Sequence, residues 1–240
     1  MGKQIPEIWH ALMIGNSRLH WAEFSGEILI ETWHNEHNIL PNPLPETVYF
    51  ASVVPQQTIF ICEKIPDAKE ITLKDIPLKN LYPTLGIDRA LAMWGASEKF
   101  GFPCLVIDGG TALTFSAVDG DRRFLGGAIL PGLRLQFRML AKRTAELPTV
   151  ELPETLPTRW AMDTGGAIAS GIVHTVLAGI ESFIQDWQQQ FSTGAIAITG
   201  GDGQWLKQQL QQQNYALFYE PDLIFWAIQS IKKSFTKTKK

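Results

Sequence analysis

The sequence has little of what several classes of protein require, beginning with cysteine. Its 240 residues include two cysteines, Cys62 and Cys104, which lie far apart and show neither a CxxC pattern nor Cys/His spacing. A disulfide framework and a zinc site are therefore not indicated, and a reducing, cytoplasmic setting is expected. The net charge is only −3 with both signs mixed along the chain, which predicts no basic surface for nucleic acid or for an acidic membrane.

Long apolar runs are lacking as well. No stretch approaches the roughly 20 apolar residues needed to cross a bilayer, and the N-terminus has no basic region followed by an apolar core. These observations predict a soluble protein that is not exported and has no membrane partner. The one run of like charge, which comprises Lys232, Lys233, Lys237, Lys239 and Lys240, is expected to be a solvated tail.

What the sequence does contain is an apolar strand that ends in a polar glycine turn. Residues 105–107 lead into Asp108, Gly109, Gly110 and Thr111, and a second strand begins at once. The N–H groups of such a turn can cradle phosphate oxygens, Thr111 adds a hydroxyl donor, and a carboxylate held beside phosphates calls for a cation. Taken alone, an Asp-Gly turn is more often an ordinary hairpin turn. Asp119 and Gly120 predict a further tight turn, and Gly126 and Gly127, followed by Pro131 and Gly132, are interpreted as the opening of a helix from Leu133.

The same pattern occurs at two other places in the chain. Residues 9–14 end in Gly15, Asn16, Ser17 and Arg18, and residues 194–198 end in a turn that contains Gly200 and Gly201. Each turn by itself could be an ordinary one. Their repetition favours phosphate binding over chance.

Hydrophobic periodicity predicts an α/β protein made of two similar halves. Strands are predicted at 9–14, 19–24, 28–33, 48–54 and 71–73, followed by a helix that starts near Gly86 and stops before Gly101. The order recurs with strands at 105–107, 113–118, 194–198 and 217–219 and with helices at 133–147, 164–191, around 206–210 and at 223–231. We therefore predict two lobes, residues 1–102 and 103–240, with a nucleotide bound between them.

The helix that starts near Gly86 carries an unusual pair in its first turn, Asp88 and Arg89. An aspartate there is ordinarily a cap or a charge that compensates the helix dipole. An arginine is harder to explain, because cations favour the opposite end of a helix.

The order and spacing of these motifs resemble the acetate and sugar kinase, chaperone and actin superfamily and, within it, the type III pantothenate kinase family. The matching segments span nearly the whole chain and comprise residues 15–17, 86–89, 108–112, 126–132, 144–148, 164–172 and 199–202. The resemblance implies two ribonuclease-H-like lobes in the actin-like ATPase fold. It also implies ATP-dependent phosphorylation of pantothenate to 4'-phosphopantothenate, the first step of coenzyme A biosynthesis, with Mg²⁺ and a monovalent cation, K⁺ or NH₄⁺. A homodimer with a composite active site is implied as well.

The resemblance assigns roles on the pantothenate side of the reaction. Asp88 would be the general base that takes the proton from the primary hydroxyl of pantothenate. Arg89 would be the partner of its carboxylate. The pantothenate-binding positions would be Tyr82, Gly86, Ile87, Asp88, Arg89 and Thr164, with Thr164 supplied across a dimer interface.

The resemblance also assigns roles on the nucleotide side. ATP would be bound by the first turn and by three positions of the second half, which gives the set Gly15, Asn16, Ser17, Arg18, Thr111, Gly200 and Gly201. Asp108 would be the ligand of the monovalent cation.

One position departs from the family pattern. The family's first motif is D-x-G-N-[ST], and Met13 stands at the position of its aspartate. Because a thioether cannot replace a hard oxygen ligand for Mg²⁺, two alternatives stay open. The chain could be a catalytically weakened, nucleotide-binding regulatory protein of the same fold, or a superfamily kinase or phosphatase with another substrate. The joint presence of Asp88, Arg89, Asp108 and Thr164 favours an active pantothenate kinase.

Overall fold

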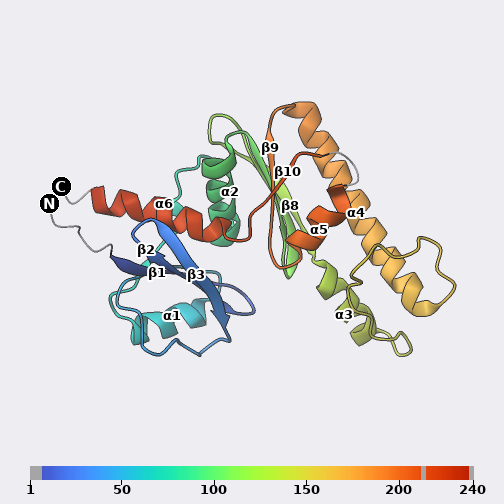
Figure 1. The fold of residues 1–240 in the computed structure, drawn as a ribbon, viewed down its shortest axis with the longest axis horizontal. Helices are drawn as coiled ribbons and strands as arrows, with labels where there is room; N and C mark the ends of the chain where they lie inside the picture. Colours follow the sequence, from blue (N-terminus) through green and yellow to red (C-terminus); the bar gives the residue numbers. More distant parts are fainter. Residues whose placement is uncertain (1–6, 212–214, 238–240) are drawn as a thin grey trace. The chain divides into compact units, whose positions relative to one another are not determined.

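A computed structural model describes residues 7–211 and 215–237 (Figure 1). The chain forms two compact units. Unit 1 comprises Met1–Gly95 and Asp222–Lys240, and unit 2 comprises Ala96–Pro221. Each unit contains one five-stranded sheet.

The sheet of unit 1 combines a meander with two parallel strands. Strands β1 (Ile8–Ile14), β2 (Leu19–Ser25) and β3 (Ile28–Asn35) are antiparallel, β4 (Val48–Ser52) is parallel to β1, and β5 (Lys69–Glu70) is parallel to β4. The spatial order is β3-β2-β1-β4-β5. A two-residue loop joins β2 to β3, and its Gly26 has φ +61, the left-handed conformation that such tight hairpins require.

Both faces of this sheet are buried by side chains that alternate along its strands. On one face, Leu12, Ile14, Trp21 and Phe50 pack with Ile61 of helix α1 (Pro55–Lys64). On the other face, Trp9 stacks on Phe24 with ring centroids 4.4 Å apart, and Trp226 of helix α6 (Leu223–Lys237) meets Phe24 edge to face. Helix α2 (Ile87–Phe100) ends before Gly101, whose φ of +95 suits a helix-terminating glycine.

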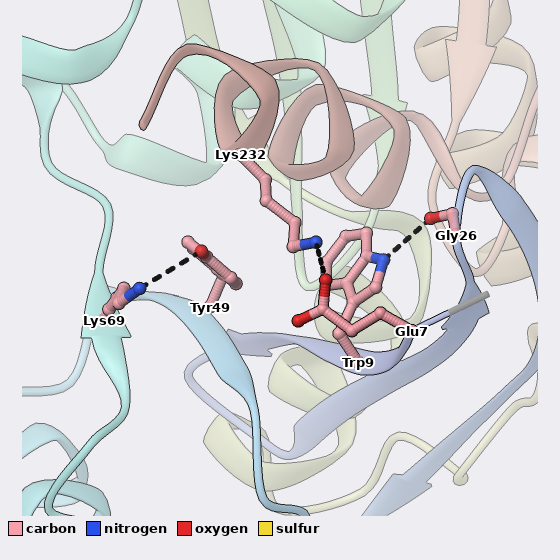
Figure 2. Close-up of polar contacts among 6 residues, drawn as sticks. All are labelled: Glu7, Trp9, Gly26, Tyr49, Lys69 and Lys232. Atoms are coloured by element: carbon pink, nitrogen blue, oxygen red, sulfur yellow. Dashed lines mark hydrogen bonds and ion pairs between the residues drawn. The ribbon is translucent and has the colours of Figure 1, made fainter. Parts of the chain in front are cut away.

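A lysine of α6 fixes this helix to β1 (Figure 2). The Lys232 ammonium lies 4.8 Å from the centre of the Trp9 ring and 3.2 Å from the Glu7 carboxylate, while Trp9 Nε1 donates to the carbonyl oxygen of Gly26 at 2.8 Å. The side chain of Lys232 is only 13% exposed, so this residue is not part of a solvated tail. Lys233 forms an ion pair with Glu27. Lys239 and Lys240 lie outside the described residues.

The sheet of unit 2 repeats the arrangement of unit 1. Its order is β10-β9-β6-β7-β8, with β6, β7 and β8 antiparallel and with β9 and β10 parallel to β6 and β9 respectively. The strands are β6 (Cys104–Gly109), β7 (Ala112–Val118), β8 (Phe124–Pro131), β9 (Ala195–Thr199) and β10 (Leu217–Tyr219), and the helices are α3 (Leu133–Arg143), α4 (Thr164–Gln190) and α5 (Gly203–Leu210). The prediction of two similar α/β halves is confirmed.

The units differ from the predicted lobes at the C-terminus. Residues 222–240 belong to unit 1, whereas the lobe 103–240 included them. The physical reason is the apolar face of α6, since Trp226 packs on Phe24 of the first sheet. Sequence order alone does not show that a terminal helix returns to the first sheet.

Four local expectations also need correction. Gly126 and Gly127, expected to open the helix from Leu133, lie within strand β8; Gly126 has φ +137 next to a shift in the pairing of β7 with β8. The strand expected at 48–54 ends at Ser52, and Pro55 then opens helix α1, where its missing N–H removes no intrahelical bond. The strand expected at 71–73 is replaced by β5 just before it and by a 3₁₀ turn at Leu73–Asp75. Helix α3 ends at Arg143, four residues earlier than expected.

Helix α4 corrects the expectation about apolar runs. Its 27 residues include an 18-residue window with mean hydropathy 1.6, so length and composition alone would allow it to cross a membrane. Its apolar face, however, lies in the core of unit 2, where Val173, Ile180 and Ile184 pack with Ile107 and Phe115 of the sheet. This is the placement of a core helix.

Candidate functional site

In unit 1, the three parallel strands β1, β4 and β5 end at the same edge of the sheet. Gly15, Val53 and Ile71 follow these ends directly, and the N–H of Val53 donates to the carbonyl oxygen of Ile14 at 3.0 Å. Ligands of open α/β sheets bind outside the carboxyl ends of the strands. A ligand-binding site is therefore expected at this edge.

The first glycine turn lies at this edge, between β1 and β2. The N–H of Gly15 donates to the carbonyl oxygen of Arg18 at 3.0 Å, and the side chains of Asn16, Ser17 and Arg18 are exposed. A Cβ on Gly15 would lie 3.6 Å from Cδ2 of His20, so the imidazole of His20 borders the turn. Burial lowers the pKa of His20, and the nearby positive groups of His34 and Arg18 lower it further. The turn thus exposes neutral hydrogen-bond donors together with one guanidinium.

A cavity of about 370 Å³ opens at the same edge. It is lined by the residues that follow β4 and β5 and by the segment that leads into α2, namely Ser52, Val53, Glu70, Ile71, Thr72, Leu73, Leu85, Gly86 and Ile87. The cavity brings together Gly86 and Ile87, both expected to bind substrate. Sequence reasoning missed Ser52, Glu70 and Thr72, and the available signal was that they lie at the ends of parallel strands.

Asp88 lies one residue beyond this lining, in the first turn of α2. Its Oδ1 accepts a hydrogen bond from the N–H of Arg89 at 2.8 Å. A Cβ on Gly86 would overlap Oδ1 of Asp88, so any larger residue at position 86 would displace this carboxylate from its present position. Burial raises the pKa of Asp88, while the backbone hydrogen bond and the charge of Arg89 oppose that increase. A carboxylate with a raised pKa is suited to accept a proton near neutral pH.

Arg89 and Tyr82 form a pair. The Nη1 of Arg89 donates to the phenol oxygen of Tyr82 at 3.1 Å, and Arg89 is only 7% exposed, whereas Tyr82 is 40% exposed. A buried guanidinium with a phenol beside it is a suitable partner for a carboxylate. The structure thus brings Tyr82, Gly86, Ile87, Asp88 and Arg89 to one end of α2.

In unit 2, the glycine turn at residues 108–111 contacts the glycine turn at residues 199–202. The N–H of Asp202 donates to the carbonyl oxygen of Gly109 at 2.8 Å. A Cβ on Gly200 would overlap Oδ1 of Asp108 and lie 2.7 Å from the carbonyl of Gly109, and Gly200 has φ +87. Only glycine fits there without strain. Asp108 therefore lies directly against the turn that contains Gly200 and Gly201.

Thr111 completes this group of turns. Its side chain is exposed, and its carbonyl oxygen accepts the N–H of Gly132, the residue before α3, at 2.9 Å. Asp202, which is 5% exposed, accepts from Nε of Arg134 on α3 at 2.7 Å. The structure brings together Asp108, Thr111, Gly200 and Gly201, and it adds the Arg134–Asp202 pair, which no sequence pattern indicated.

Thr164 begins helix α4 of unit 2, whereas the residues that line the cavity belong to unit 1. The carboxylate of Asp163 caps the helix by accepting from the N–H of Gly166 at 2.8 Å. Thr164 is exposed, and so are two apolar side chains just before it, Trp160 at 85% and Met162 at 100%.

The described residues include no group of three or more His, Cys, Asp or Glu side chains that could hold a metal ion. Mg²⁺ in phosphoryl-transfer sites is usually held by one or two carboxylates, by water and by the phosphates of the substrate.

Comparison with known proteins identifies the family. The family model described as type III pantothenate kinase matches residues 11–186. The chain belongs to the type III pantothenate kinase family. The type III pantothenate kinase of Nostoc sp. is 45% identical, and the alignment covers 95% of this chain and 96% of the relative. That of Synechocystis sp. is 47% identical over 95% of this chain and 91% of the relative.

Solved structures resemble this family member in fold. A Baf family protein from Campylobacter jejuni, named as a conserved transcriptional activator, superposes with TM-score 0.68 at 21% identity and covers 95% of this chain and 99% of its own. The activator of 2-hydroxyisocaproyl-CoA dehydratase from Clostridium difficile, solved with bound ADPNP, gives 0.51 at 11% identity over 96% and 98% of the two chains. The expected actin-like ATPase fold is confirmed.

Proposed function

We propose that this chain transfers the γ-phosphoryl group of ATP to pantothenate and thereby performs the first step of coenzyme A biosynthesis. Family membership supports the reaction, which uses ATP and a divalent metal. The observation that carries the assignment to this chain is the cavity at the carboxyl edge of unit 1, which Gly86 and Ile87 line directly before the half-buried carboxylate of Asp88. The two cysteines are free, and we propose a cytoplasmic location.

In the proposed mechanism, Asp88 is the general base. Its raised pKa favours accepting the proton of the pantothenate primary hydroxyl as that oxygen attacks the γ-phosphorus. Arg89 and Tyr82 would bind the pantothenate carboxylate, with the phenol keeping the guanidinium oriented. The apolar lining residues Val53, Ile71 and Leu85 suit the gem-dimethyl part of the substrate.

The nucleotide contacts are assigned separately in each unit. In unit 1, the N–H groups and polar side chains of Gly15, Asn16, Ser17 and Arg18 would bind phosphate oxygens. In unit 2, Thr111, Gly200 and Gly201 would contact ATP, and Asp108 would hold the monovalent cation. Mg²⁺ would neutralise charge on the transferred phosphoryl group, held mainly by the phosphates and water.

A coupled assay for ADP release, run with and without pantothenate, tests the proposal. ADP release that depends on pantothenate, with 4'-phosphopantothenate as product, is expected. The alternative of a regulatory protein is kept because of Met13, and ATP binding without pantothenate-dependent turnover would favour it. Turnover with a different alcohol alone would favour a superfamily kinase with another substrate.

We further propose a homodimer in which the neighbouring subunit brings Thr164 to the pantothenate site. The exposed Trp160 and Met162 directly before Thr164 support this, since such apolar side chains gain by being covered. Mixing Asp88→Asn with Thr164→Ala is expected to restore about a quarter of the parental rate, because half of the dimers are hybrids and each hybrid has one intact site. Thr175→Ala, an exposed threonine of the same helix, is the active control. A fully active monomer, or no recovery on mixing, would contradict the proposal.

A monovalent cation at Asp108 has a separate consequence. The negative charge of a carboxylate about 4 Å from a phosphate opposes binding by about 1–4 kcal/mol, so the rate in K⁺ or NH₄⁺ should exceed that in Na⁺ or Li⁺ by about tenfold or more. Asp108→Asn should remove most of that dependence, while Asp121→Asn, a carboxylate with its side chain 68% exposed, should keep it. Equal rates in all four chloride salts at matched ionic strength would show that Asp108 has a structural role only.

A further inference from the structure

A histidine to which the sequence assigned no role makes a hydrogen bond to the first glycine turn, residues 15–18. Nε2 of His37 lies 2.9 Å from the carbonyl oxygen of Gly15. Because a carbonyl can only accept, Nε2 is the donor in this hydrogen bond. His37 is half-buried in the loop between β3 and β4, 22 residues from Gly15 in the sequence.

The loop that carries His37 is itself held by a buried glutamine. Gln57 of α1 is only 6% exposed, and its amide makes two hydrogen bonds to Asn38, one from the N–H of Asn38 to Oε1 at 3.1 Å and one from Nε2 to Oδ1 at 2.9 Å. Asn38 has φ +63, a conformation that asparagine tolerates better than most residues. A buried amide with its partners in place fixes the loop firmly.

This chain of hydrogen bonds begins at the substrate cavity. Gln57 lies in the first turn of α1, and its own N–H donates to the carbonyl of Val54 at 3.0 Å. Val54 follows the cavity-lining residues Ser52 and Val53, and Ser52 Oγ accepts from the N–H of Val54 at 3.0 Å. The series Val54, Gln57, Asn38, His37 and Gly15 therefore links the cavity wall to the turn.

We propose that His37 is a positioning residue for ATP, which orients the Gly15 carbonyl and with it the phosphate-binding N–H groups of the turn relative to the cavity. This inference rests on the proposed assignment of the turn to ATP phosphates. A backbone cradle binds phosphate well only if its N–H groups are already aligned, because alignment on binding would reduce affinity. His37 supplies that alignment without touching the nucleotide.

The test compares two substitutions of His37. His37→Leu removes the donor, and His37→Gln offers an amide N–H in its place. His37→Leu is expected to raise KM for ATP about five- to tenfold, the size of one lost hydrogen bond, with KM for pantothenate unchanged within about twofold. His37→Gln is expected to recover most of the loss. Gln57→Leu should shift KM for ATP in the same direction, whereas Gln56→Leu, its exposed neighbour on α1, should not.

The proposal is overturned if KM for ATP in His37→Leu stays within twofold of the parent, or if His37→Leu and His37→Gln show equal losses. A role in stability alone would lower the melting temperature and leave the ratio of the two KM values unchanged, which also contradicts it. Calorimetric titration with a non-hydrolysable ATP analogue repeats the comparison without turnover. If the parent binds the analogue but does not phosphorylate pantothenate, the proposed function fails while the role of His37 is still decided by the titration.

Discussion

Asp88→Asn is expected to lower kcat by a factor of about 10² to 10⁴, the usual contribution of a positioned general base. The asparagine keeps the shape of the side chain, and its Oδ1 can still accept from the N–H of Arg89 as Asp88 does at 2.8 Å. Binding of pantothenate to the Tyr82–Arg89 pair should therefore persist. Steady-state kinetics and pantothenate titration of the variant provide the measurement, and near-normal turnover would show that Asp88 is only a helix cap.

The raised pKa of Asp88 also predicts how this variant changes the stability of the fold. Burial favours the neutral carboxyl, so the folded protein binds this proton more tightly than the unfolded chain does. The folded state is consequently penalised as the pH rises above the ordinary pKa of a carboxyl, and the penalty is complete once the pH exceeds the raised pKa of Asp88. Asp88→Asn removes it, so at pH 7 the melting temperature should be unchanged or higher. In the parent, kcat/KM should fall as the pH drops through the raised pKa.

A matched control separates these effects from damage to the helix. Asp163→Asn changes another carboxylate at a helix start, one that accepts from Gly166 at 2.8 Å and is exposed. It should leave kcat within about twofold of the parent, because asparagine is also a good cap. A clear fall in melting temperature for Asp88→Asn at pH 7 would contradict the sign of the pKa argument.

The parts of the fold that the sequence predicts well are those with strong local signals. The helix predicted at 164–191 agrees with α4 to within one residue, because a continuous apolar face runs along it. The repeated sheets followed from the recurrence of strand, glycine turn and strand. Helix α1 is missing from the prediction because a proline can follow the end of a strand or begin a helix. Only the packing of Ile61 on the sheet shows that Pro55 begins a helix.

The parts of the site that the sequence cannot predict are those made by long-range contacts. Motif positions such as Asp88 and Asp108 are local, whereas the cavity wall joins residues from the ends of β4 and β5 to Gly86. The partners of His37 and Arg134 are 22 and 68 residues away in the sequence. Neither pairing has a periodic signature, so only the folded chain reveals it.

The second large effect is expected at Met13, where the family motif carries an aspartate. Met13 is only 4% exposed, and the residues directly opposite it are His20 on β2 and Ala51 on β4. An aspartate would place a negative charge in this buried position. His20 is the one titratable residue directly opposite, and its lowered pKa disfavours the positive charge that could pair with the new carboxylate. Met13→Asp should therefore reduce the free energy of unfolding by about 2–5 kcal/mol.

Thermal unfolding and ATP titration of Met13→Asp measure this directly. A protein of this size loses about 2–4 °C per kcal/mol, so the melting temperature should fall by about 5–15 °C, while Met13→Leu, which conserves volume, should change it little. Because the neighbours of Met13 pack against a thioether, the new carboxylate should not be oriented towards a magnesium ion, and affinity for ATP–Mg²⁺ should not rise. Tighter ATP–Mg²⁺ binding at unchanged stability would instead mean that the site has kept the geometry for the family's aspartate and that methionine weakens it.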